Sequence, residues 1–164
     1  MRMFRKFSQV FFSFIFILSV QILVQNNALA AEASPVGVWK TIDDKTNKPR
    51  SIVQIWQQGD ELRGRILKIF FRPGESAKDV CLECKGASHN QPILGMTIIW
   101  GMTKQSERWE GGRILDPKNG KIYRCLLTLS SDNQQLNVRG YIGVTLFGRT
   151  QTWFRQANAA IEQQ

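Results

Sequence analysis

Apolar and polar residues alternate along most of this chain from position 36 onward, in short runs that turn-forming residues separate. A period of two is typical of β-strands that bury one face, and no run between these turns has the length and period of an amphipathic helix. Eight strands are predicted, at residues 36–42, 51–57, 61–70, 93–102, 108–115, 121–129, 135–142 and 146–154. Short antiparallel strands in this number close most easily into one small barrel, so we expect an all-β, eight-stranded antiparallel barrel.

Residues 71–92 break this rhythm. They contain Pro73-Gly74, two closely spaced cysteines and the single histidine of the chain, without a periodic pattern. A loop of this length is uncommon in a compact domain and is typical of lids and binding elements. We therefore expect a long loop between the third and fourth strands.

The N-terminus has the three-part order of a secretory signal peptide. Basic residues precede an apolar stretch at 10–24, and Ala28-Leu29-Ala30 supplies the small residues that signal peptidase requires. The alternative is a membrane anchor, but serines and a glutamine interrupt the stretch, which is short for a spanning helix. We expect cleavage after Ala30, a single domain at 31–164 with no membrane span, and a periplasmic location, with secretion as the alternative.

The chain is basic, with a formal net charge of +9 at pH 7, of which residues 1–30 contribute three charges. The remaining charges are scattered and form no run of the kind that nucleic-acid-binding proteins carry. We therefore expect no nucleic-acid partner. The charge favours solubility, and a weak attraction to anionic envelope surfaces is a second interpretation.

Both ends of the predicted sheet resemble lipocalins. Gly37-x-Trp39 lies on the first strand and Arg155 directly follows the last. In lipocalins the Trp closes one end of the barrel and the Arg guanidinium packs over the indole ring. The resemblance assigns barrel closure to Gly37, Trp39 and Arg155.

Further motifs follow one another across the whole domain. They are Gly37-Val38-Trp39-Lys40-Thr41-Ile42-Asp43, Cys81-x-x-Cys84, Gln91-Pro92-Ile93-Leu94-Gly95, Trp109-x-Gly111-Gly112-x-Ile114-x-Asp116-Pro117, Gly120-Lys121-x-Tyr123, Val138-Arg139-Gly140-Tyr141-Ile142-Gly143 and Leu146-x-Gly148-Arg149-Thr150-Gln151-x-Trp153. With them, residues 36–155 resemble a family of exported bacterial proteins catalogued as a domain of unknown function. The resemblance implies a lipocalin-like barrel, a Gram-negative periplasmic location and no assigned catalytic activity. It also implies, by analogy of fold, a fatty-acid-like or other apolar ligand.

Three interpretations fit the pair Cys81 and Cys84. The favoured one is a structural disulfide, since an oxidising compartment favours pairing. With His89 and Cys125 the pair is formally a zinc set, and its spacing is also that of a thiol redox centre. The loop context lacks the helix N-terminus of redox centres, so we expect a disulfide, no metal and no cofactor. Cys125 is expected to be a buried free thiol, with pairing to the loop as the alternative.

Catalytic signals are weak. No serine lies in a nucleophile elbow, His89 is the single imidazole, and the paired acids Asp43-Asp44 and Asp60-Glu61 lie in turns, where capping explains them. We therefore expect a protein that is not an enzyme.

The candidate ligand-binding residues are aromatic, aliphatic and basic. They are Trp56, Ile66, Phe70, Ile98, Trp100, Leu127, Arg139, Tyr141 and Arg149. The last two strands give conflicting faces: strict alternation groups Arg139, Tyr141 and Arg149 with Trp153, opposite Leu136 and Val138. A bulge at a glycine would reconcile them. The arginines are either solvated on the outer wall or line the cavity and hold an anionic head group.

The leading hypothesis is an exported barrel that binds a small apolar or amphipathic molecule. The alternative is an envelope scaffold that uses the 71–92 loop to dock another macromolecule. Thiol redox activity through Cys81 and Cys84 is third.

Overall fold

The computed structural model describes residues 33–157, which lie in one compact unit, Ala33–Gln164. The predicted signal peptide lies outside the described residues. Within the described part, no helix is both long enough and apolar enough to cross a membrane.

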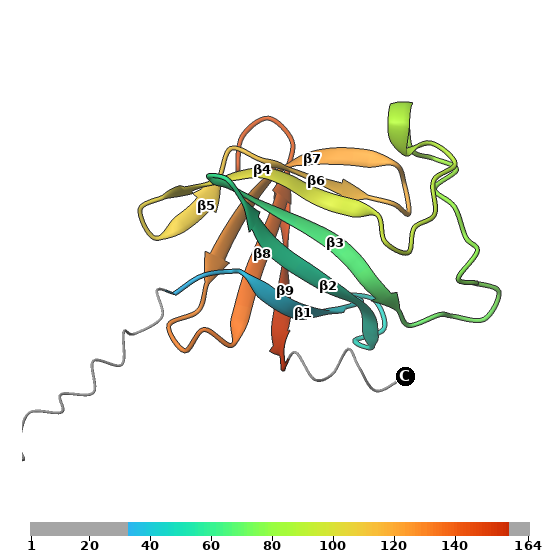
Figure 1. Ribbon diagram of the computed structural model, residues 1–164, viewed down its shortest axis with the longest axis horizontal. Helices are drawn as coiled ribbons and strands as arrows, with labels where there is room; N and C mark the ends of the chain where they lie inside the picture. Colours follow the sequence, from blue (N-terminus) through green and yellow to red (C-terminus); the bar gives the residue numbers. More distant parts are fainter. Residues whose placement is uncertain (1–32, 158–164) are drawn as a thin grey trace, which may run out of the picture. The chain divides into compact units, whose positions relative to one another are not determined.

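Nine strands and one 3₁₀ turn make up the domain (Figure 1). The strands are β1 (Gly37–Ile42), β2 (Pro49–Gln58), β3 (Glu61–Ile69), β4 (Thr97–Gln105), β5 (Arg108–Glu110), β6 (Arg113–Asp116), β7 (Lys121–Leu129), β8 (Gln135–Tyr141) and β9 (Gly148–Gln156). The short turn η1 (Gly86–Ser88) lies in the long loop between β3 and β4. The predicted all-β class and the position of the long loop are confirmed.

The sheet closes on itself. Every pairing between named strands is antiparallel, each strand except β5 pairs with the next one along the chain, and β1 pairs with β9 to complete the ring. Both β5 and β6 lie between β4 and β7 and pair with each of them. They therefore share one of eight positions in the ring, and the predicted eight-stranded antiparallel barrel is confirmed.

Two glycines divide the strand predicted at 108–115. Gly111 has φ +84°, which is strained for residues with a Cβ, and a Cβ at Gly112 would lie 2.4 Å from the Trp100 carbonyl oxygen. The chain therefore leaves the ladder at this point and rejoins it as β6. Alternation alone does not reveal the break, because the apolar residues continue on both sides of it.

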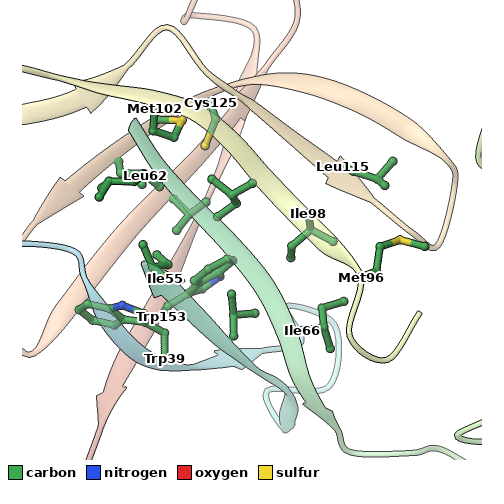
Figure 2. Close-up of a cluster of buried hydrophobic side chains, with 14 of the residues drawn as sticks. Trp39, Ile55, Leu62, Ile66, Met96, Ile98, Met102, Leu115, Cys125 and Trp153 are labelled. Atoms are coloured by element: carbon green, nitrogen blue, oxygen red, sulfur yellow. The ribbon is translucent and has the colours of Figure 1, made fainter. Parts of the chain in front are cut away.

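Side chains from all around the ring fill the interior. Figure 2 shows this cluster, with Trp39 and Trp153 in its lower part and Met102 and Cys125 at its top. The buried members include Val53, Ile55, Leu62, Ile66, Ile69, Ile98, Ile99, Met102, Trp109, Leu115, Cys125, Leu127, Leu136, Val138 and Trp153. Register shifts between β3 and β4 interrupt the alternation, and Ile98 and Ile99 are both buried beside them.

One end of the barrel is closed by Trp39 and Arg155. The guanidinium carbon of Arg155 lies 4.3 Å from the centre of the Trp39 ring, and Trp39 Nε1 donates a hydrogen bond to Pro35 O at 2.8 Å. Arg155 also donates to three backbone carbonyls, those of Ser34, Val36 and Asn133. Desolvation by burial lowers the pKa of Arg155 from its ordinary value. The N-terminal segment and the β7–β8 turn are thus fixed to the last strand.

Gly37 is required by the same arrangement. A Cβ at this position would lie 2.7 Å from Nη1 of Arg155, and the residue has φ +140°. The Gly-x-Trp pattern on β1 therefore reflects the path of the arginine side chain across the end of the barrel.

Candidate functional site

The long loop between β3 and β4 is held against the barrel. Cys81 and Cys84 form a disulfide, and backbone hydrogen bonds join Cys81 to Gln91 and Asn90. The sulfur of Cys81 lies 3.3 Å from Pro117 O in the β6–β7 turn. The expected disulfide is therefore present; it joins two residues of the loop, and one of its sulfurs contacts the neighbouring turn.

Both disulfide sulfurs are enclosed. Cys81 and Cys84 are 0% and 3% exposed. Thiol–disulfide exchange needs a sulfur that an incoming thiolate can reach, and this pair offers none. The geometry thus favours a structural role for the pair over redox activity.

The histidine and the third cysteine do not join this pair. Nδ1 of His89 lies 3.0 Å from the carbonyl oxygen of Cys84, while Cys125 is a buried free thiol inside the barrel. The described residues contain no cluster of three or more side chains that could hold a metal ion.

Burial raises the pKa of the Cys125 thiol from 9.0 to about 12. Below pH 9 this thiol is protonated in both the folded and the unfolded protein, so it does not make the unfolding free energy depend on pH. Between pH 9 and 12 it ionises only in the unfolded state, so the wild type should lose up to about 1.4 kcal/mol of unfolding free energy per pH unit relative to Cys125→Ala. Urea unfolding of both proteins on either side of pH 9 measures the difference. Parallel pH profiles would contradict the assignment.

A hollow of about 340 Å³ opens on the surface beside η1. It is lined by Ala87, Ser88, Gln91, Pro92, Leu94, Gly95, Met96 and Thr97. None of the predicted ligand-binding residues contributes to it. This hollow belongs to the long loop and the start of β4, outside the barrel interior.

The six apolar candidates from the first seven strands separate into three groups. Ile66, Ile98 and Leu127 are buried in the core, and Trp100 is half-buried against it. Trp56 lies on the outer face of β2, next to inward-facing Ile55, with the Arg65 guanidinium 5.7 Å from its ring. The expectation that Trp56 lines the interior is therefore wrong, because the alternation along β2 directs it outward.

Phe70 follows the end of β3 and is partly exposed, with Lys68 Nζ 5.3 Å from its ring. It lies at the edge of the barrel where the long loop begins. Its backbone N–H donates to Arg50 O, which positions the first residue of the loop.

The register of β8 and β9 resolves the conflict between their faces. Leu136 pairs with Trp153, Val138 with Gln151 and Gly140 with Arg149, with no register shift over this stretch. No bulge is therefore involved, contrary to expectation. Residues of opposite parity pair across this hairpin, so both strands alternate strictly and still place Leu136, Val138 and Trp153 on one inner face.

The three basic and aromatic candidates on these strands consequently do not share a face. Arg139 and Tyr141 lie on the outer wall, whereas Arg149 lies on the inner face, at the rim of the barrel. Nε and Nη2 of Arg139 donate to Thr145 O at 2.9 and 2.5 Å. The predicted grouping of Arg139 and Tyr141 with Arg149 is wrong: of the three, only Arg149 is at an inner-face position, and its side chain is 65% exposed at the rim.

Arg149 belongs to a polar group at the open end, here called the rim cluster, which consists of Asp44, Arg149 and Gln151. Arg149 forms an ion pair with Asp44, and Gln151 Nε2 donates to Asp44 Oδ1 at 3.3 Å. The β1–β9 ladder ends at the pair Lys40–Phe154, so the two strands separate below the rim. Asp44, from the β1–β2 turn, spans the gap between them.

A second ion pair at this end joins the β1–β2 turn to the start of the long loop. Asp43 pairs with Arg72, and hydrogen bonds from Arg72 and then Thr46 hold the pKa of Asp43 well below its usual range. Sequence reasoning explained both acids as turn residues. The signal that could have identified them was two adjacent carboxylates in one turn of a basic barrel, which invites arginine partners.

Residues 37–155 match the profile of a family described as "Uncharacterized protein conserved in bacteria (DUF2147)". No curated protein matches the sequence. Among solved structures, the fold is similar to that of protein HP1028 from Helicobacter pylori, whose structure is described as belonging to the lipocalin family. The TM-score is 0.67, and the sequences are 18% identical over 79% of this chain and 87% of that chain. At this identity the likeness shows a lipocalin-like fold.

Proposed function

The chain belongs to the uncharacterised bacterial family DUF2147, and we propose that it is an exported binding protein rather than an enzyme. Its ligand is one small molecule with an apolar body and an anionic head, taken up at the open end of the barrel. The N-terminal pattern of basic, apolar and small residues supports export to the periplasm through a cleaved signal peptide.

The observation that carries the proposal is the inner-face position of Arg149. This residue continues the inner face of β9 beyond Trp153, and its side chain, 65% exposed at the rim, can reach an anionic group that enters the open end. Its partner in the structure is Asp44, a carboxylate from a turn rather than from the barrel wall. We infer that Asp44 occupies the place of the ligand's anionic group and yields it on binding.

The apolar part of the ligand would lie below the rim. Half-buried Ile93, Trp100 and Ile114 pack against the core cluster, and Gly140, beside Arg149, leaves its Cβ position 3.6 Å from Ile114. Trp39 and Trp153 fill the end of the barrel that Arg155 closes. The site is therefore shallow, and it would take the head group and the adjacent part of a single acyl chain.

Dodecanoate is a suitable probe, measured by titration calorimetry. Arg149→Gln should weaken its binding about tenfold or more, since a charge-assisted hydrogen bond is lost. Asp44→Asn should strengthen binding severalfold, because the competing carboxylate is removed. Arg65→Gln, on the outer face of β3, is the matched control and should bind as the wild type does.

Two results would overturn this proposal. One is an absence of dodecanoate binding to both the wild type and Asp44→Asn. The other is equal weakening by Arg149→Gln and Arg65→Gln. Mass spectrometry of an organic extract of the purified protein would add the identity of any molecule bound in the cell.

A further inference from the structure

The β8–β9 loop carries four large apolar side chains in solvent. Ile142, Val144, Leu146 and Phe147 are 64%, 59%, 78% and 72% exposed, and together they are called the apolar tip. In Figure 1 this loop extends beyond the sheet at the top of the view. Scattered exposed apolar residues are ordinary, but four within six residues mark an interaction surface.

The backbone beneath the apolar tip is already hydrogen-bonded within the protein. Arg139 donates to the carbonyls of Thr145 and Leu146, and Arg124 donates to that of Gly143 at 3.3 Å. The carbonyls of Val144 and Phe147 accept from N–H groups of the same loop. Five consecutive carbonyls thus have partners without water.

This feature suits the loop to a medium without water. A backbone carbonyl that enters hydrocarbon without a hydrogen-bond partner costs several kcal/mol, typically ~4–8 kcal/mol on a cyclohexane scale. A loop that stays in solvent has no need of internal donors, because water supplies them. The two arginines also fix the loop, so little conformational entropy is lost when its side chains are buried.

The surroundings of the apolar tip are basic. Arg139 on β8 and Arg149 on β9 flank the loop, Arg149 being paired with Asp44, and neighbouring β7 adds Lys121 and Arg124. Neither Arg124 nor Arg139 forms an ion pair with a carboxylate among residues 33–157. Exposed apolar side chains with basic side chains beside them are complementary to a bilayer that exposes anionic head groups.

We propose that the apolar tip docks the protein on the surface of an anionic phospholipid bilayer. Leu146 and Phe147 enter the boundary between head groups and acyl chains, while Arg124 and Arg139 lie at the level of the phosphates. A convex loop suits a bilayer surface, whereas a protein groove or a second copy of this chain would need a complementary hollow. The proposal is independent of the ligand site, since Arg149 is not part of the tip.

Co-sedimentation with vesicles tests the proposal. Vesicles of phosphatidylglycerol and phosphatidylcholine in equal parts should bind the exported protein, and pure phosphatidylcholine vesicles should bind it more weakly. The double variant L146S/F147S should weaken binding at least about tenfold, because burying even half of each side chain is worth that factor. The matched control is Leu82→Ser, whose side chain is 67% exposed on the long loop and should leave binding unchanged.

All variants carry the same N-terminus, so any contribution that it makes to vesicle binding is the same in each. Mass spectrometry records whether residues 1–30 are present. Added salt should weaken the wild type's binding. Equal binding by L146S/F147S and Leu82→Ser would overturn the proposal. So would unchanged vesicle binding by L146S/F147S together with a lower sedimentation coefficient in solution, since the tip would then join two copies of the chain.

Discussion

Trp39→Ala should lower the unfolding free energy by about 3–5 kcal/mol, a large part of the stability of an ordinary domain. The side chain is fully buried, donates a hydrogen bond to Pro35 O and supports the Arg155 guanidinium. Its loss removes the side chain that closes this end of the barrel and leaves the Arg155 guanidinium over a cavity. Urea unfolding followed by tryptophan fluorescence and circular dichroism measures the change.

The matched control is Trp56→Ala. Trp56 is also a tryptophan under an arginine, but it is only partly buried on the outer face of β2, so a loss of about 1 kcal/mol is expected. The loss of unfolding free energy in Trp39→Phe should lie between those of Trp39→Ala and Trp56→Ala, because the variant keeps most of the packing and loses the hydrogen bond to Pro35 O. Equal losses in Trp39→Ala and Trp56→Ala would show that the closed end does not hold the barrel together.

Local pattern predicted the architecture because barrel strands obey a short-range rule. Alternation along 37–42, 121–129 and 135–141 follows from one face being buried, and each of these strands was found within one or two residues of its expected bounds. Glycines that break or bend strands were less informative. The break at Gly111-Gly112 depends on how closely Trp100 approaches, which is a tertiary contact.

The site was harder to predict, for two physical reasons. The face on which a residue of β9 lies depends on its partner in β8. The connecting loop pairs even-numbered residues of β8 with odd-numbered residues of β9. Arg139 and Arg149 therefore diverge although both have odd numbers. The reach of Asp44 from its turn to Arg149 joins positions more than a hundred residues apart, which no local pattern encodes.

Trp56 shows a different limit. Its size favoured the interior, whereas the period of β2, with Val53 and Ile55 inside, placed it outside. The alternation of residues along the strand predicts the face better than side-chain size does, because an outward tryptophan can still cover apolar surface and stack with an arginine. The same rule correctly places Leu127 inside the barrel.

Gly120→Ala should detach the long loop from the barrel. A Cβ at Gly120 would lie 1.8 Å from the carbonyl oxygen of Glu83 and 2.7 Å from the backbone nitrogen of Cys84, so the β6–β7 turn and the disulfide segment cannot both keep their positions. The substitution also strains a φ of +63°. Overpacking against backbone should add about 1–3 kcal/mol or more to the cost of that strain.

Gly59→Ala separates the two effects. Gly59 has nearly the same φ, +61°, and no atom within 4 Å of its Cβ position, so its replacement should cost only the strain of about 1–2 kcal/mol. Limited trypsin digestion gives the second readout, since the loop contains Lys78 and Lys85. Gly120→Ala should be cleaved there much faster than Gly59→Ala. If the two variants match in stability and in cleavage, the position of the loop does not depend on its contact with the β6–β7 turn.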